Sequence, residues 1–155
     1  GDAVMFSYIG LAAGDLASGF ISQALRSRKK TVFGFILLTM TFIVTYLYWP
    51  FQSSSGFYAG CFFLGFGVGY WALFVTIAAE QFGTNLRSTV ATTVPNFIRG
   101  SVVPLIFVFG YLRENLNILQ AALIVGICTI IIAFWALRLI DETFSRDLNY
   151  VEKDH

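Results

Sequence analysis

Charged side chains are scarce in this chain of 155 residues: they make up 12% of it, whereas a soluble domain carries about 25%. Hydrophobic residues make up 57%. A chain this short cannot bury so much apolar surface in one core, so we expect the lipid bilayer to be its solvent. The net charge of +1 gives no reason to expect a nucleic-acid partner.

Residues that ligate metals are equally few. The sole histidine is His155, and the two cysteines, Cys61 and Cys128, lie inside apolar runs. We predict that both cysteines are small buried hydrophobic residues. A zinc or haem site has almost no ligands to draw on here, so we expect no metal and no cofactor.

Long apolar runs, in contrast, are abundant. A transmembrane helix needs about 20 mostly apolar residues, and five runs qualify: 4–25, 32–49, 57–79, 90–112 and 117–140. Backbone polar groups in lipid must be satisfied within the segment, which favours helices over strands. The sequence therefore predicts an all-α integral membrane protein, with one five-helix transmembrane domain, 1–140, and a polar tail, 141–155.

Lysines and arginines are unevenly divided between alternate loops. Eight fall on the side of the first loop, the third loop and the tail, and one, Arg113, falls on the other side. Positive loops stay in the cytoplasm, so we expect the N-terminus outside and the tail inside a cell membrane, inner or plasma. Tyr46, Tyr48 and Trp49 then lie at the outer boundary, where aromatic residues gather.

The five predicted helices are not equivalent. The second and fifth have no charge in their apolar cores and are predicted to face lipid. The other three carry glycines and ionisable groups and are predicted to face protein or water. Gly10 and Gly14 form a GxxxG pair in the first helix, and Gly65 and Gly69 form another in the third. Such pairs let helix backbones approach closely.

Three stretches at the ends of helices follow recognisable patterns. Residues 19–30, G-F-I-S-Q-A-L-R-S-R-K-K, resemble G-x-x-x-D-x-x-G-R-(R/K)-(R/K), with Gln23 in place of Asp and Arg26 in place of Gly. Residues 80–89, E-Q-F-G-T-N-L-R-S-T, resemble E-x-(F/L)-P-T-x-x-R-x-T, with Gly83 in place of Pro. Residues 142–152 begin E-T-F-S-R-D-L and resemble E-T-x-G-x-x-L-x-x-x-E.

These patterns are those of the major facilitator superfamily (MFS), and the chain resembles the C-terminal half of such a transporter, similar to its sugar and organic-ion porters. The resemblance implies helices eight to twelve of twelve, with the seventh helix and the N-terminal half as missing partners. It implies a secondary active transporter that moves a small polar or charged solute, a sugar or an organic ion, by alternating access. Gly1 is not a start methionine, and we expect this fragment to be unable to transport alone.

The resemblance also implies a role for the cytoplasmic ends of the helices. In the superfamily such residues form ion-pair networks that hold the inner gate, and here the set is Gly19, Gln23, Arg26, Arg28, Glu80, Arg87 and Glu142. Ordinary positive-inside charge is the alternative explanation for the basic residues.

Two ionisable residues lie near the middle of predicted spans, Asp15 in the first and Arg99 in the fourth. Inserting such a residue costs about 2.5–3.5 kcal/mol, and these residues usually pair or line a water-filled path. Together with Ser18 and Asn96 they are predicted to face one region that binds the solute or a coupling ion. A structural ion pair is the alternative.

Aromatic residues and prolines add to this predicted cavity. Tyr70 and Trp71, in the middle of the third helix, are candidates for stacking on the solute, with ordinary core packing as the alternative. Pro95 and Pro104 are predicted to kink or break the fourth helix beside the cavity, because proline removes a backbone donor.

Two other functions use fewer of these residues. An enzyme needs a nucleophile with its base, or metal ligands, and the predicted spans contain no histidine. A helical membrane scaffold without transport activity is the alternative function, although it does not require Asp15 and Arg99. We also expect the fragment to form a homo-oligomer through its first, third and fourth helices, whose glycine and polar faces have lost their partners.

Overall fold

The structure, a computed structural model, describes residues 1–145, and within these residues all regular secondary structure is α-helical. The helices are α1 (Asp2–Leu25), α2 (Arg28–Tyr48), α3 (Ser54–Gly67), α4 (Trp71–Glu80), α5 (Thr84–Asn115) and α6 (Ile118–Leu139). Counting α3 and α4 as one segment, five are long and apolar enough to cross a membrane. The prediction of an all-helical chain with five such segments is confirmed. The part of the predicted tail beyond residue 145 lies outside the described residues.

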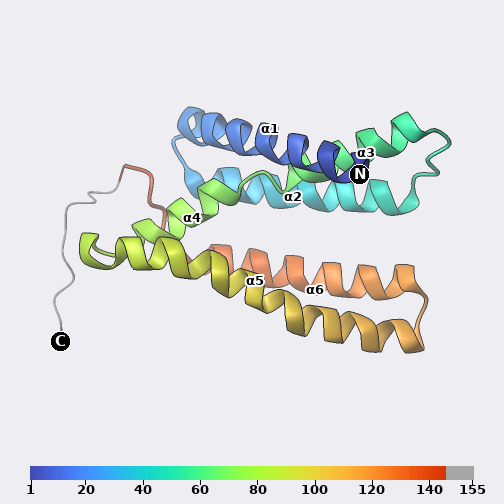
Figure 1. Cartoon of the computed structure of the whole chain (residues 1–155). Coiled ribbons are helices and arrows are strands. Elements are labelled where there is room, and N and C mark those ends of the chain that lie inside the picture. Colours follow the sequence, from blue (N-terminus) through green and yellow to red (C-terminus); the bar gives the residue numbers. More distant parts are fainter. Residues whose placement is uncertain (146–155) are drawn as a thin grey trace. The chain divides into compact units, whose positions relative to one another are not determined.

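The described chain divides into two compact units. The first holds residues 1–77 together with 142–145, and the second holds Ala78–Asp141. In the first unit, α1, α2 and α3 lie side by side, and the contact between α1 and α3 is the most extensive (Figure 1). The core of this unit includes Val32, Phe35 and Ile36 from α2 and Cys61 from α3. These helices hold the predicted site residues of the first unit in place.

Glycines explain why α1 and α3 pack so closely. A Cβ atom added at Gly10 would overlap the Phe62 backbone, and one added at Gly65 would overlap the Ser7 backbone. At Gly14 and Gly69 the added Cβ atom of each glycine would meet the backbone of the other. The two predicted GxxxG pairs therefore face each other, and the prediction of close backbone packing is confirmed.

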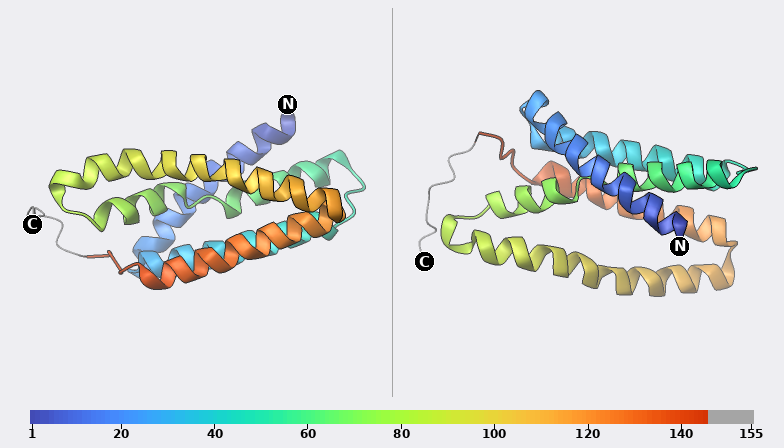
Figure 2. Two further views of the ribbon diagram at one scale, coloured as in Figure 1. Left: turned by 90° about the horizontal axis from the view of Figure 1, so that it is seen from below. Right: turned by 45° about the horizontal axis from the view of Figure 1, so that its top comes forward.

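The third span is interrupted, whereas the sequence predicted one continuous helix over residues 57–79. Helix α3 ends at Gly67 and α4 begins at Trp71, and the ribbon between them is non-helical (Figure 2). Gly65, Gly67 and Gly69 surround the break, and glycine weakens a helix by about 1 kcal/mol per residue relative to alanine. The hydropathy of the segment does not reveal this break because both halves are apolar.

The second unit contains the end of α4 and the helical hairpin of α5 and α6. The two-residue connection of Leu116 and Asn117 forces these helices to run antiparallel. Asn117 and Gln120 form a capping box that starts α6. Pro95 and Pro104 both lie inside the continuous helix α5, so neither proline breaks this span, and the predicted kink stays a prediction.

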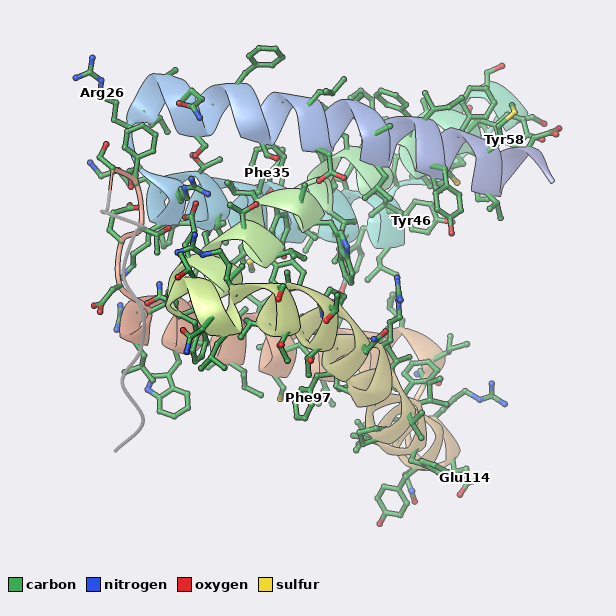
Figure 3. The ribbon with its side chains drawn as sticks, turned by 60° about the vertical axis from the view of Figure 1, so that its left-hand side comes forward. Arg26, Phe35, Tyr46, Tyr58, Phe97 and Glu114 are labelled. Atoms are coloured by element: carbon green, nitrogen blue, oxygen red, sulfur yellow. The ribbon has the colours of Figure 1, made fainter. Side chains whose placement is uncertain are left out.

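The two ends of the first unit differ in chemistry. Arg26 lies at one end, and Tyr46 and Tyr58 lie at the other (Figure 3). At the aromatic end, the Tyr46 ring lies 5.3 Å from Phe51 and 6.1 Å from Phe57, measured between ring centroids. This separation of basic and aromatic ends agrees with the expected arrangement, while the orientation in a membrane stays a prediction.

The cysteines behave differently from each other. Both are free thiols; Cys61 is buried in the first unit, as predicted, but Cys128 is exposed. Cys128 lies on the outer surface of α6, where exposed residues such as Ile124, Ile127 and Ile131 also lie. The prediction that Cys128 is buried is therefore wrong. In a helix that is apolar on all sides, the sequence does not show which side chains point toward the neighbouring helix.

Candidate functional site: the broken span and the polar face of α5

The Asp15 side chain lies at the break in the third span. Its Oδ1 atom accepts a hydrogen bond of 3.1 Å from the backbone N–H of Ala72, in the first turn of α4. The first N–H groups of a helix have no acceptor within the helix, and the N-terminus carries partial positive charge. Asp15 therefore caps α4 from a different helix. Gly14, the residue before Asp15, is in close backbone contact with Gly69, and this contact places the Asp15 side chain beside the start of α4.

The other side of the break is capped by α2. The Thr39 hydroxyl lies 2.7 Å from the Gly67 carbonyl oxygen, at the last residue of α3, and 2.8 Å from the carbonyl oxygen of Phe35 in its own helix. A Cβ atom at Gly67 would come within 3.1 Å of Thr39 Cα, so a larger residue would require α2 to shift by a few tenths of an ångström. The sequence analysis did not identify Thr39, because threonines in apolar spans commonly bond to their own backbone.

Ser18, Tyr70 and Trp71 also belong to the first unit. The Ser18 hydroxyl donates to the Asp15 carbonyl oxygen at 2.9 Å, and the side chain is buried. The Tyr70 ring lies 6.1 Å from Phe35, and Trp71 packs edge-on against Phe74 at 5.1 Å. Tyr70 is half-buried and Trp71 is exposed. The structure thus brings Asp15, Tyr70 and Trp71 to the same break, and what they bind stays a prediction.

Asn96 and Arg99 lie together on α5 in the second unit. The Arg99 Nη1 atom donates to Asn96 Oδ1 at 3.3 Å, and Asn96 Nδ2 donates to the Thr92 carbonyl oxygen at 3.1 Å. All three side chains are exposed, and Phe97 between them points away from the helix (Figure 3). These three side chains therefore form a connected polar row on α5. The prediction that Asp15 and Arg99 face one common region remains a prediction.

Glu142, one of the predicted gate residues, joins the end of the described chain to the start of α2. Its carboxylate accepts from the Ser27 hydroxyl and from the backbone N–H groups of Arg28, at 3.0 Å, and Lys29, at 3.2 Å. It therefore caps the N-terminus of α2, where a negative charge is favoured. The backbone N–H groups of Thr143 and Phe144 also bond to Oε1, both at 3.1 Å.

These contacts change the acidity of Glu142. Burial raises the pKa of its carboxyl group, but the hydrogen bonds from Ser27 and from backbone N–H groups act in the opposite direction. The net result is a pKa below the ordinary value, because these bonds favour the charged form.

The remaining predicted gate residues lie at or near the ends of α1, α2, α4 and α5. Gly19 is exposed, with open space where a Cβ atom would lie. The Gln23 carbonyl oxygen accepts from the backbone N–H of Arg26, which ends α1. Arg28 begins α2, Glu80 ends α4, and Arg87 Nη2 lies 3.4 Å from the Phe82 carbonyl oxygen.

Ser27 is a second residue that the sequence analysis missed. Its hydroxyl accepts from the Lys30 backbone N–H at 3.2 Å, so it is the N-cap of α2. Serine before a long apolar run is a standard helix-start signal. Three basic residues, Arg28, Lys29 and Lys30, follow Ser27 directly and make the helix start resemble a charged loop.

Comparisons with family models, with curated proteins and with solved structures found no match to this chain. Its function must therefore be argued from its own residues. Among the described residues, no three His, Cys, Asp or Glu side chains are grouped as a metal site would require.

Proposed function

We propose that this chain is the C-terminal-half fragment of a secondary active transporter of the MFS type. The observation that carries the proposal is the backbone conformation at three positions where the sequence departs from the resembled patterns. Arg26 stands in place of glycine and has φ 47° and ψ 36°, and Ser145 also stands in place of glycine and has φ 64°. Gly83 stands in place of proline and has φ −62°.

Each of these conformations is the one that the superfamily's usual residue favours. Glycine adopts positive φ readily, whereas other residues do so at a cost, and proline fixes φ near about −65°. Arg26 and Ser145 are the only non-glycine residues with positive φ within residues 1–145. If the sequence matched these patterns only by chance, the φ angles at the departing positions would not be expected to suit the usual residues. Their agreement therefore supports the family assignment.

The broken third span supports transport as the activity. Discontinuous helices near the bilayer midplane are a recurrent feature of secondary transporters, because irregular backbone is tolerated at that depth only beside protein or water. Asp15 at the break and Arg99 on α5 provide ionisable groups inside apolar spans. A solute that such groups recognise is small and polar or charged, such as a sugar or an organic ion.

The proposed function also implies a membrane location and protein partners for this chain. It places the chain in an inner or plasma membrane, with the N-terminus outside and the tail in the cytoplasm. A seventh helix and an N-terminal half cover the exposed polar face of α5 in the complete protein. When these partners are absent, a second copy of the chain covers that face. The glycine faces of α1 and α3 contribute less to such an oligomer, because they already pack on each other.

The test is solute flux into proteoliposomes that contain the full-length protein, screened with labelled sugars and organic ions. Arg99→Ala should reduce flux at least about tenfold with normal expression, because the guanidinium provides charge and directional donors at the site. Arg113→Ala, at the far end of the same helix, is the matched control and should transport normally. Absence of flux for every solute class, with the protein folded, would favour the scaffold function.

A further inference from the structure

We infer that Asp15 is a positioning residue: its carboxylate holds the third span in its broken form by capping α4, with Thr39 as the matching cap on α3. The inference concerns the conformation of the span and does not depend on the proposed transport function. It also differs from the role predicted from the sequence, in which Asp15 contacts the solute or a coupling ion.

The hydrogen bonds at the break show what the two side chains replace. In a continuous helix, Gly69 N–H would bond to Gly65 and Ala72 N–H would bond to Val68, four residues earlier. Instead, Gly69 N–H bonds to the Phe66 carbonyl at 3.0 Å, and the Val68 carbonyl accepts from Tyr70 N–H at 2.8 Å. The helical pattern is therefore lost. One backbone group on each side of the break needs another partner: the Gly67 carbonyl before it and the Ala72 N–H after it.

Side chains of two neighbouring helices provide these partners. Asp15 Oδ1 accepts from Ala72 N–H at 3.1 Å. The Thr39 hydroxyl shares its one hydrogen between the Gly67 carbonyl oxygen, at 2.7 Å, and the Phe35 carbonyl oxygen, at 2.8 Å. A backbone polar group without a partner is costly in an apolar environment, so both bonds stabilise the break. The Asp15 bond has an additional favourable component, since a carboxylate at a helix N-terminus interacts with the partial positive charge there.

The contact between Gly14 and Gly69 determines where along the third span the Asp15 carboxylate lies. Gly14 and Gly69 touch through their backbones, and a Cβ atom on either would overlap the other chain segment. Asp15 follows Gly14 directly, and Tyr70 follows Gly69, so the carboxylate is held beside the start of α4. The Ser18 hydroxyl donates to the Asp15 backbone carbonyl oxygen, so it does not compete with the Ala72 N–H as a donor to the carboxylate.

The consequence is that the start of α4 depends on a hydrogen-bond acceptor carried by α1. When the carboxylate is removed, the backbone from Val68 to Ala72 loses its external cap and opens to exchange. A residue that only contacts a solute would leave these amides unchanged in the absence of that solute. This difference separates the two roles of Asp15.

The test is amide hydrogen exchange, measured by mass spectrometry on the intact protein in nanodiscs without solute. Asp15→Ala should speed exchange of the Ala72 amide by at least about tenfold, as expected for a lost bond to a charged acceptor. Asp15→Asn keeps an acceptor oxygen and should restore most of the protection. Asp2→Ala, an exposed acid in the first turn of the same helix, is the matched control and should leave residues 68–72 unchanged.

Thr39 provides the second arm of the test. Thr39→Val removes the hydroxyl at constant shape and should speed exchange around the break, whereas Thr39→Ser should not. Thr41→Val is the control, because the Thr41 hydroxyl bonds to Leu37 in its own helix. Equal exchange in wild type, Asp15→Ala and Asp2→Ala would overturn the inference. If Asp15→Ala does not fold, a Thr39→Val exchange pattern identical to that of Thr41→Val would overturn it as well.

Discussion

The Glu142 carboxylate accepts a hydrogen bond from the Ser27 hydroxyl, although 115 positions separate the two residues in the chain. Ser27 is at the same time the N-cap of α2. The segment that follows α6 is thereby connected to the loop between α1 and α2. The contact joins two of the three stretches that resemble MFS patterns.

Removing the Glu142 carboxylate should destabilise the start of α2. We expect Glu142→Ala to lower the free energy of unfolding by about 1 kcal/mol, the usual effect of losing a helix cap. The measurement is thermal unfolding in mild detergent. Glu114→Ala, which removes an exposed acid at the end of α5, is the control and should have no measurable effect. A stability loss of equal size in both variants would contradict the capping role.

The same carboxylate predicts a pH dependence. The pKa of Glu142 in the folded state lies below its ordinary value of 4.5, so the folded state favours the charged form. Its contribution is fully present above that value and is lost as pH falls through the lower pKa of the folded state. The difference in melting temperature between wild type and Glu142→Gln should therefore be largest near neutral pH and shrink below pH 4.5. A difference that grows on acidification would be inconsistent with the depressed pKa.

Replacing Arg26 by glycine, the residue of the resembled pattern, should stabilise the protein. The φ angle of Arg26 is 47°, a left-handed conformation that is unfavourable for arginine but not for glycine. We expect Arg26→Gly to raise the free energy of unfolding by about 0.5 kcal/mol, after allowing for the larger entropy of glycine in the unfolded chain. Arg28→Gly, in the first turn of α2, should instead lower it. Calorimetry on both variants decides the question, and destabilisation by Arg26→Gly would show that its side chain matters more than its backbone.

The glycine interface between α1 and α3 should not tolerate a single methyl group. In Gly65→Ala the new Cβ atom would overlap the Ser7 backbone, so the helices must separate, at a cost of about 1–3 kcal/mol. Gly34→Ala places its Cβ atom in open space and should be neutral or slightly stabilising, because alanine favours helix. Unfolding midpoints of the two variants provide the comparison. Similar midpoints would mean that the interface is looser than the structure indicates.

The orientation in the membrane can be measured by cysteine labelling of the full-length protein. In a background with Cys61 and Cys128 replaced by alanine, Ser54→Cys should react with an impermeant reagent from outside and Asn149→Cys only after permeabilisation. Ser54 begins α3, whereas Asn149 lies outside the described residues. The expectation follows from the uneven division of lysine and arginine. Labelling of both positions from the same side would reject the five-span topology.

The sequence by itself determined which segments are helices. Each span is long and apolar, and a helix satisfies its backbone groups locally, so composition is sufficient to locate it. The two GxxxG pairs were also readable, because small residues at a spacing of four have few other uses in a span. Asn96 and Arg99 lie three positions apart, and helical periodicity alone places them on one face of their span.

Only the tertiary structure decided where a span is broken. The two prolines of α5 do not break it, and the break lies instead between Gly67 and Trp71. Its two caps, Asp15 and Thr39, come from other helices, and Glu142 likewise caps α2 from a distant part of the chain. Local propensity depends on neighbours in the sequence, whereas these backbone groups are satisfied by neighbours in space, which no local pattern identifies.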